Sequence, residues 1–204
     1  METTNTRTAS KGRVVGFEDS PFARALFGDV RWAWIWLIIR LYAGYEWLSA
    51  GLGKISSPAW TGSAAGSALT GFVKGALTKS TGAHPDVQGF YATFLSNVVL
   101  PNAAVFGFIV ALGETLVGIA LILGIFTGIA AFFGSFMNMN YLLAGTVSTN
   151  PILLILAIFL VLAWKTAGWW GLDRWVLPAL GTPWRPGVVF SSHDNESAAK
   201  VISS

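Results

Sequence analysis

Four long apolar runs dominate this sequence and limit what it can fold into. They lie near 31–54, 101–123, 126–147 and 150–167. Each run approaches the roughly 20 residues that a helix needs to cross the hydrocarbon core of a bilayer. The 204-residue chain is 53% hydrophobic and 11% charged, whereas a soluble domain carries about 25% charged residues. The pattern predicts an all-α integral membrane protein, a bundle of four transmembrane helices.

The runs divide the chain into three parts. Residues 1–30 form a polar N-terminal tail, 31–182 the membrane domain, and 183–204 a polar C-terminal tail whose end we expect to be disordered. Lysines and arginines gather in the N-terminal tail and again from Lys165 onward, and an even number of spans returns the chain to the side where it began. The positive-inside rule therefore predicts a multi-pass protein of the inner (plasma) membrane with both termini in the cytoplasm.

Short amphipathic helices are predicted between the first two runs and after the fourth. Apolar residues recur at helical spacing between 65 and 77, and again between 90 and 98. We expect these two helices to lie on the outer surface of the membrane. The tryptophan-rich stretch 169–178 predicts a similar interfacial helix on the inner side.

The composition excludes several kinds of chemistry. The chain has no Cys, so it offers neither a disulfide, a thiolate ligand nor a covalent haem attachment. Its two histidines, His84 and His193, lie outside the apolar runs, so we expect no haem and no metal site in the membrane. A net charge of +3 is too small to indicate a nucleic-acid surface. Redox chemistry would need an organic cofactor or a partner chain.

Ionisable residues inside the apolar runs are the strongest functional signal. Arg40 and Glu46 lie in the first run and Glu114 in the second. Such a group costs roughly 2.5–3.5 kcal/mol at the centre of a membrane on insertion scales. Counted from the cytoplasmic ends of the helices at about 1.5 Å per residue, all three fall near the bilayer centre. We therefore expect Arg40 and Glu114 to pair, with Glu46 facing a cavity.

Two interpretations of these residues stay open. A buried Arg–Glu pair can simply fix how helices pack. Alternatively, the residues surround a pocket for a quinone, which needs an apolar slot, hydrogen-bond donors and a group that moves protons. The catalytic candidates are then Arg40, Glu46 and Glu114, and the cofactor-binding candidates are Trp47, Asn138 and Tyr141.

Three motifs punctuated by glycine follow one another along the chain. They are 40–54 followed by Pro58-Ala-Trp60, then 112–127 beginning Leu112-Gly113-Glu114, and finally Gly171-Leu-Asp173-Arg174-Trp175. Together they resemble the DoxX/DoxD family. The resemblance implies a four-helix membrane protein. For DoxD it implies the large subunit of a thiosulfate:quinone oxidoreductase, which couples two thiosulfates into tetrathionate, passes the electrons to quinone and works with a smaller partner subunit.

We therefore predict a quinone-interacting membrane subunit of an oxidoreductase of the DoxD type. The electrons would come from thiosulfate or from a partner, and thiosulfate would bind at the outer rim, where Lys54, Lys74 and Lys79 supply positive charge. The expected partners are membrane lipid, quinone and a second protein subunit, with no nucleic acid. The alternative is a non-enzymatic scaffold that docks another protein within a membrane complex. A transporter is a third option, which would have to oligomerise to form a path.

Overall fold

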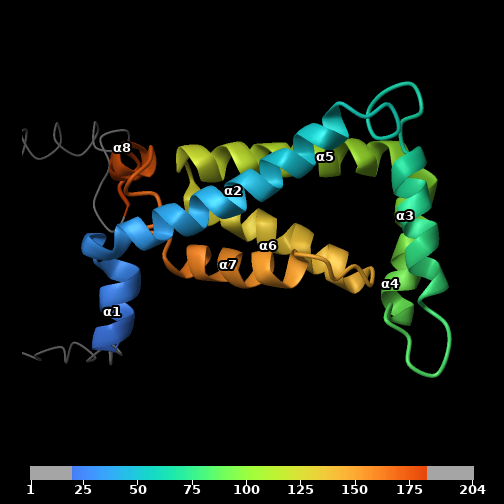
Figure 1. Ribbon diagram of the computed structural model, residues 1–204, viewed down its shortest axis with the longest axis horizontal. Coiled ribbons are helices and arrows are strands. Elements are labelled where there is room, and N and C mark those ends of the chain that lie inside the picture. The colour runs from blue at the N-terminus through green and yellow to red at the C-terminus, as the bar shows by residue number, and fades with distance from the viewer. Residues whose placement is uncertain (1–19, 183–204) are drawn as a thin grey trace, which may run out of the picture.

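The computed structural model describes residues 20–182, and the regular elements within that range are all helical. The predicted C-terminal tail, 183–204, and residues 1–19 lie outside the described residues. Four long helices pack along one axis (Figure 1). They are α2 (Ala33–Ile55), α5 (Ala103–Leu123), α6 (Thr127–Leu143) and α7 (Asn150–Leu162).

Shorter helices lie across the two ends of this bundle (Figure 1). At one end are α1 (Pro21–Gly28), the 3-10 turn η1 (Val30–Trp32) and α8 (Asp173–Ala179), and at the other are α3 (Ser67–Thr78) and α4 (Gly89–Phe94). Helix α1 lies within the predicted N-terminal tail, and it contacts the bundle. The indole of Trp36 donates to the Leu26 carbonyl at 2.9 Å, and the Thr166 hydroxyl donates to the Phe27 carbonyl at 3.1 Å.

The all-α class is confirmed, and each predicted run holds one of the four long helices. By length and composition, one helix of the described residues can cross a membrane, the 35-residue segment Gly89–Leu123. Helix α7 is apolar but has 13 residues, α6 has 17, and the 23-residue α2 carries Arg40, Glu46 and Lys54. The crossing of the membrane by all four helices therefore stays a prediction.

The segment Gly89–Leu123 is not a straight rod. At about 1.5 Å per residue its length would be about 50 Å, well beyond the roughly 30 Å of a hydrocarbon core. A π-helical turn, η2 (Leu95–Val99), and a 3-10 turn, η3 (Leu100–Asn102), which contains Pro101, interrupt it. Irregular turns of this kind and proline bend helices. As a result α4 turns across the end of the bundle, beside α3 (Figure 1).

Helices α2 and α5 run antiparallel and touch through glycines. A Cβ built at Gly51 would overlap the backbone nitrogen of Thr115, and one built at Gly118 would overlap the backbone nitrogen of Leu48. Because glycine has no side chain, the two backbones approach closely, as in small-residue contacts between membrane helices. This contact fixes the register of α2 against α5.

Apolar side chains fill the inside of the bundle and also cover its outside. Trp36, Leu121 and Leu160 are almost fully buried in the centre of the bundle, and a second buried cluster joins α3, α4 and the start of α5. On the outer surface, Ile38 is 60% exposed and Phe136 is 62% exposed. Apolar residues on every side of a helix bundle are typical of surroundings made of lipid.

The glycine contact between α2 and α5 generates the first prediction. Gly51→Ala should destabilise the protein by about 1–3 kcal/mol, because the added methyl group must push two backbones apart. Gly53→Ala is the matched control, since a Cβ at Gly53 meets nothing within 4 Å. Thermal unfolding in detergent should show a lowered midpoint for Gly51→Ala alone, and equal midpoints would contradict the proposed contact.

Candidate functional site

Arg40 is buried and bound to backbone carbonyls. Its Nη1 donates to the carbonyls of Leu121 at 2.6 Å and Ile122 at 2.8 Å, and its Nη2 donates to that of Trp170 at 3.2 Å. The first two carbonyls belong to the last turn of α5, where the helix offers them no N–H partner. A cation there is also favoured by the helix dipole. The contacts of Arg40 are therefore those of a helix cap.

Asp173, at the start of α8, caps the next helix from the other side. One carboxylate oxygen accepts from the Phe126 amide at 2.6 Å and the other from the Thr127 amide at 2.9 Å. These amides open α6, where partners within the helix are missing. Gly124 and Phe126 both have positive φ angles, 65° and 47°. The tight α5–α6 turn is thus held by a cation from α2 and an anion from α8.

Glu114 lies in the middle of α5 with 1% of its surface exposed. Its Oε2 lies 2.6 Å from Nζ of Lys54, and its Oε1 accepts from the Tyr141 hydroxyl at 2.5 Å. The predicted Arg40–Glu114 pair is wrong. Counting depth from the helix ends assumed that α2 and α5 end level, whereas the first turns of α2 extend past the α5–α6 turn. Arg40 therefore lies beside the end of α5, and Lys54 beside its middle.

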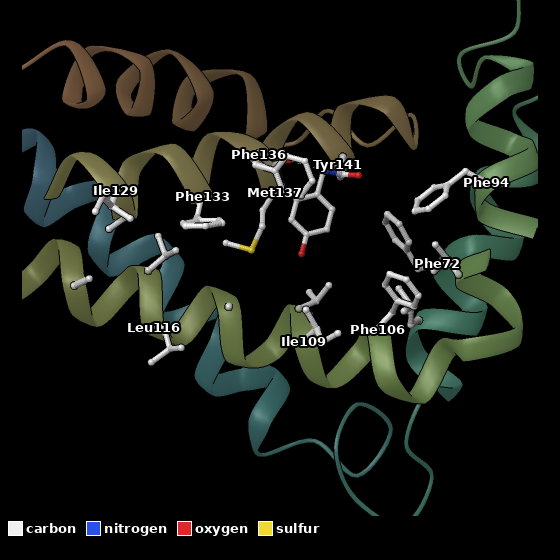
Figure 2. Close-up of a pocket in the computed structure, with 18 of the residues that line it drawn as sticks. Phe72, Phe94, Phe106, Ile109, Leu116, Ile129, Phe133, Phe136, Met137 and Tyr141 are labelled. Carbon is white, nitrogen blue, oxygen red and sulfur yellow. Dashed lines mark hydrogen bonds between the residues drawn. The ribbon is translucent and has the colours of Figure 1, made fainter. Parts of the chain in front are cut away.

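A groove of about 680 Å³ runs between α5 and α6. Phe72, Phe94 and Phe106 gather at its α3–α4 end, and Phe133 and Met137 line the α6 side (Figure 2). Three polar side chains line this otherwise apolar space, and they are Tyr91, Asn140 and Tyr141. The Tyr141 hydroxyl points across the groove toward α5, where Glu114 receives its hydrogen bond (Figure 2).

The polar end of the groove also links α4 to α6. The Tyr91 hydroxyl donates to the backbone carbonyl of Asn140 at 3.1 Å and to its side-chain Oδ1 at 3.0 Å. The Asn140 amide in turn donates to the Phe136 carbonyl at 2.8 Å. Tyr91 is not among the site residues predicted from the sequence. Its signal was a tyrosine on the apolar face of an amphipathic segment, where the hydroxyl needs a buried partner.

Of the six predicted site residues, the structure brings Glu114 and Tyr141 together and adds Lys54. Trp47 is buried in the core cluster of the bundle rather than in the groove wall. Asn138 is fully buried, and neither polar atom of its side chain has a hydrogen-bond partner. Glu46 is half-buried on α2, away from the groove lining. The predicted catalytic and cofactor-binding roles of all six residues stay predictions, and the described residues hold no cluster suited to a metal.

A model of the DoxX family matches residues 35–146. The matched range contains α3 to α6 and nearly all of α2, and with them Lys54, Glu114 and Tyr141, whereas Asp173 lies beyond it. Neither a curated protein nor a solved structure matches the chain.

The burial of Glu114 generates a prediction about its partner. Lys54→Met should destabilise the protein by about 3–5 kcal/mol, since removing one member of a buried pair leaves the other uncompensated. The double variant Lys54→Met/Glu114→Gln should recover much of that loss, because no buried charge remains. Thermal midpoints in detergent test this, with the exposed Lys74→Met as the control. Additive losses in the double variant would show that the two residues are not coupled.

Proposed function

The chain belongs to the DoxX family, and we propose that it is a quinone-interacting membrane subunit of an oxidoreductase. DoxX proteins are membrane-associated, and the long apolar helix of this chain agrees with that setting. One observation carries the proposal. The Tyr141 hydroxyl lines an apolar groove and donates to a buried carboxylate, Glu114, which pairs with Lys54.

In the proposal, all four long helices cross the inner membrane. The exposed apolar side chains on the outside of the bundle would face lipid. The short helices across both ends would then lie at the two membrane surfaces. At the α8 end, Lys165 lies over the ring of Trp164 and Arg174 over that of Trp169, at 5.7 and 5.1 Å. Tryptophan and basic residues are enriched at that level of a membrane. We place this end in the cytoplasm and α3 and α4 outside.

The groove has the size and the apolar, aromatic walls that the head of a quinone or quinol needs. Its volume of about 680 Å³ falls within the roughly 300–1,000 Å³ typical of small-molecule sites. Aromatic walls would hold the ring, and the apolar length between α5 and α6 would hold part of the tail. Tyr141 is the polar group that would meet an oxygen of the head.

Protons would pass between that oxygen and the surface of the protein through three side chains. A hydroxyl can accept a proton on one side while it donates on the other, so Tyr141 can relay protons to and from Glu114. Glu114 contacts Lys54, whose side chain is 20% exposed and whose Nζ lies 5.2 Å from the ring centre of Trp60. Lys54 would exchange protons with water at that end of α2.

Electrons would come from thiosulfate, with a partner subunit at the point of entry. Oxidation of two thiosulfates to one tetrathionate releases two electrons, and a quinone takes up two electrons and two protons to become a quinol. The rim lysines expected to attract thiosulfate are partly engaged within the protein. Lys54 binds Glu114, and Lys79 donates to the Gly145 carbonyl at 2.7 Å. This arrangement favours an electron-entry site on the partner.

A scaffold that docks another protein is the second candidate. The observation that favours it is the exposure of tryptophans around α8, where Trp170 is 64% exposed and Trp175 is 65% exposed. Purification in mild detergent separates the two candidates. A bound quinone supports the oxidoreductase, whereas a second chain in fixed proportion with no quinone supports the scaffold.

The proposal predicts thiosulfate-dependent reduction of decylubiquinone in membranes that contain this chain with its partner. Glu114→Gln should lower that rate by roughly 10²–10⁴-fold, the range expected for loss of a group that transfers protons. The matched control is Asp86→Asn, an exposed acid of the α3–α4 loop. Equal rates with and without the chain would reject thiosulfate as donor. An unchanged rate in well-folded Glu114→Gln would reject the site.

A further inference from the structure

The hydroxyl proton of Tyr141 already forms a hydrogen bond within the protein. Glu114 lies between two groups, the Lys54 ammonium at 2.6 Å and the Tyr141 hydroxyl at 2.5 Å. An ammonium can only donate, so Oε2 of Glu114 accepts from Lys54, and Oε1 accepts from the Tyr141 hydroxyl. A phenol has a single proton, so Tyr141 gives that proton to Glu114. The hydroxyl then presents lone pairs to the groove.

The hydroxyl proton of Tyr91 also forms its hydrogen bond within the protein. Its hydroxyl donates to acceptors of Asn140, the backbone carbonyl and Oδ1. The orientation of that amide is fixed by its own hydrogen bond, because its nitrogen donates to the Phe136 carbonyl. Both hydroxyls that line the groove therefore offer acceptors, and among the lining side chains one amide N–H of Asn140 is left as a donor.

We infer that the groove selects the reduced form of its ligand, a quinol, over the corresponding quinone. The inference rests on the proposed function for the ligand class and adds its redox form. A quinol carries phenolic O–H groups that donate to Tyr141. A quinone carries carbonyl oxygens that only accept, so Tyr141 would face it acceptor to acceptor. A buried polar group left without its partner weakens binding, here by an expected factor of about 10 or more.

The test compares one molecule in two redox forms. Titration calorimetry under argon measures the dissociation constants of decylubiquinol and decylubiquinone for the full chain in detergent micelles. The expected result is that the quinol binds at least about tenfold more tightly. Equal binding, or tighter binding of the quinone, would overturn the inference and leave the proposed function standing. Failure of both forms to bind would overturn the proposed function itself.

Two variants separate the hydrogen-bond argument from a general structural effect. In Glu114→Gln the new amide can donate to Tyr141, which frees the Tyr141 proton for the groove, so the preference should fall to unity or reverse toward the quinone. In Tyr141→Phe the acceptor is gone, and the preference for quinol should disappear.

Tyr45→Phe is the matched control, because Tyr45 is 65% exposed on α2 and does not line the groove. It should keep the tenfold preference. A preference that survives unchanged in both Glu114→Gln and Tyr141→Phe would overturn the inference, since these residues would then not set the selectivity.

Discussion

The backbone contact between α2 and α5 determines where the charges of this protein lie. Gly51 and Gly118 let the two helices touch, and this contact leaves little freedom for one helix to slide along the other. In this register Lys54 reaches Glu114 in the middle of α5, and Arg40 reaches the carbonyls at its end. A shift by one turn would separate both sets of partners. The groove depends on the same contact, because Glu114 holds Tyr141 in place from the α5 side.

Each buried charge in the described bundle is compensated in a different way. Arg40 is satisfied mainly by the carbonyls that end α5, and Asp173 by the amides that begin α6. Together they hold a turn in which Phe126 has a positive φ angle, a conformation that is unfavourable for a residue other than glycine. Glu114, in contrast, is satisfied by side chains, one of them in the wall of the groove. Side chains with transferable protons can take part in proton transfer, whereas contacts to backbone groups hold helices in place.

The helical architecture could be predicted because apolar runs and helical spacing are local features of a sequence. The pairing of charges could not, since it depends on how far one helix extends past another. The sequence contained Lys54 on the same stripe of α2 as Arg40, but depth counted from helix ends favoured Arg40 as the partner of Glu114. Asp173 lay in a recognised motif, yet its role as a cap appears only when the turn it binds is known.

Helical faces were harder to predict than helices. Asn138 and Tyr141 lie nearly one turn apart on α6, and both were predicted to bind the cofactor. In the structure Asn138 is buried in the bundle, whereas Tyr141 lines the groove. Adjacent residues on a helix differ by about 100° in direction, so three residues leave a difference of about 60°. That difference is enough to separate a core position from a groove wall when the helices are closely packed.

The position of Lys54 has a consequence for energy conservation. Lys54 lies near the α3 end of α2, while Arg40 and Asp173 hold the opposite end of the bundle. In the proposed orientation, a relay from the groove through Glu114 to Lys54 would reach one aqueous phase and not the other. Quinone chemistry in this groove would therefore be vectorial: protons taken up or released there would change the electrochemical gradient across the membrane, with a sign set by the direction of electron flow.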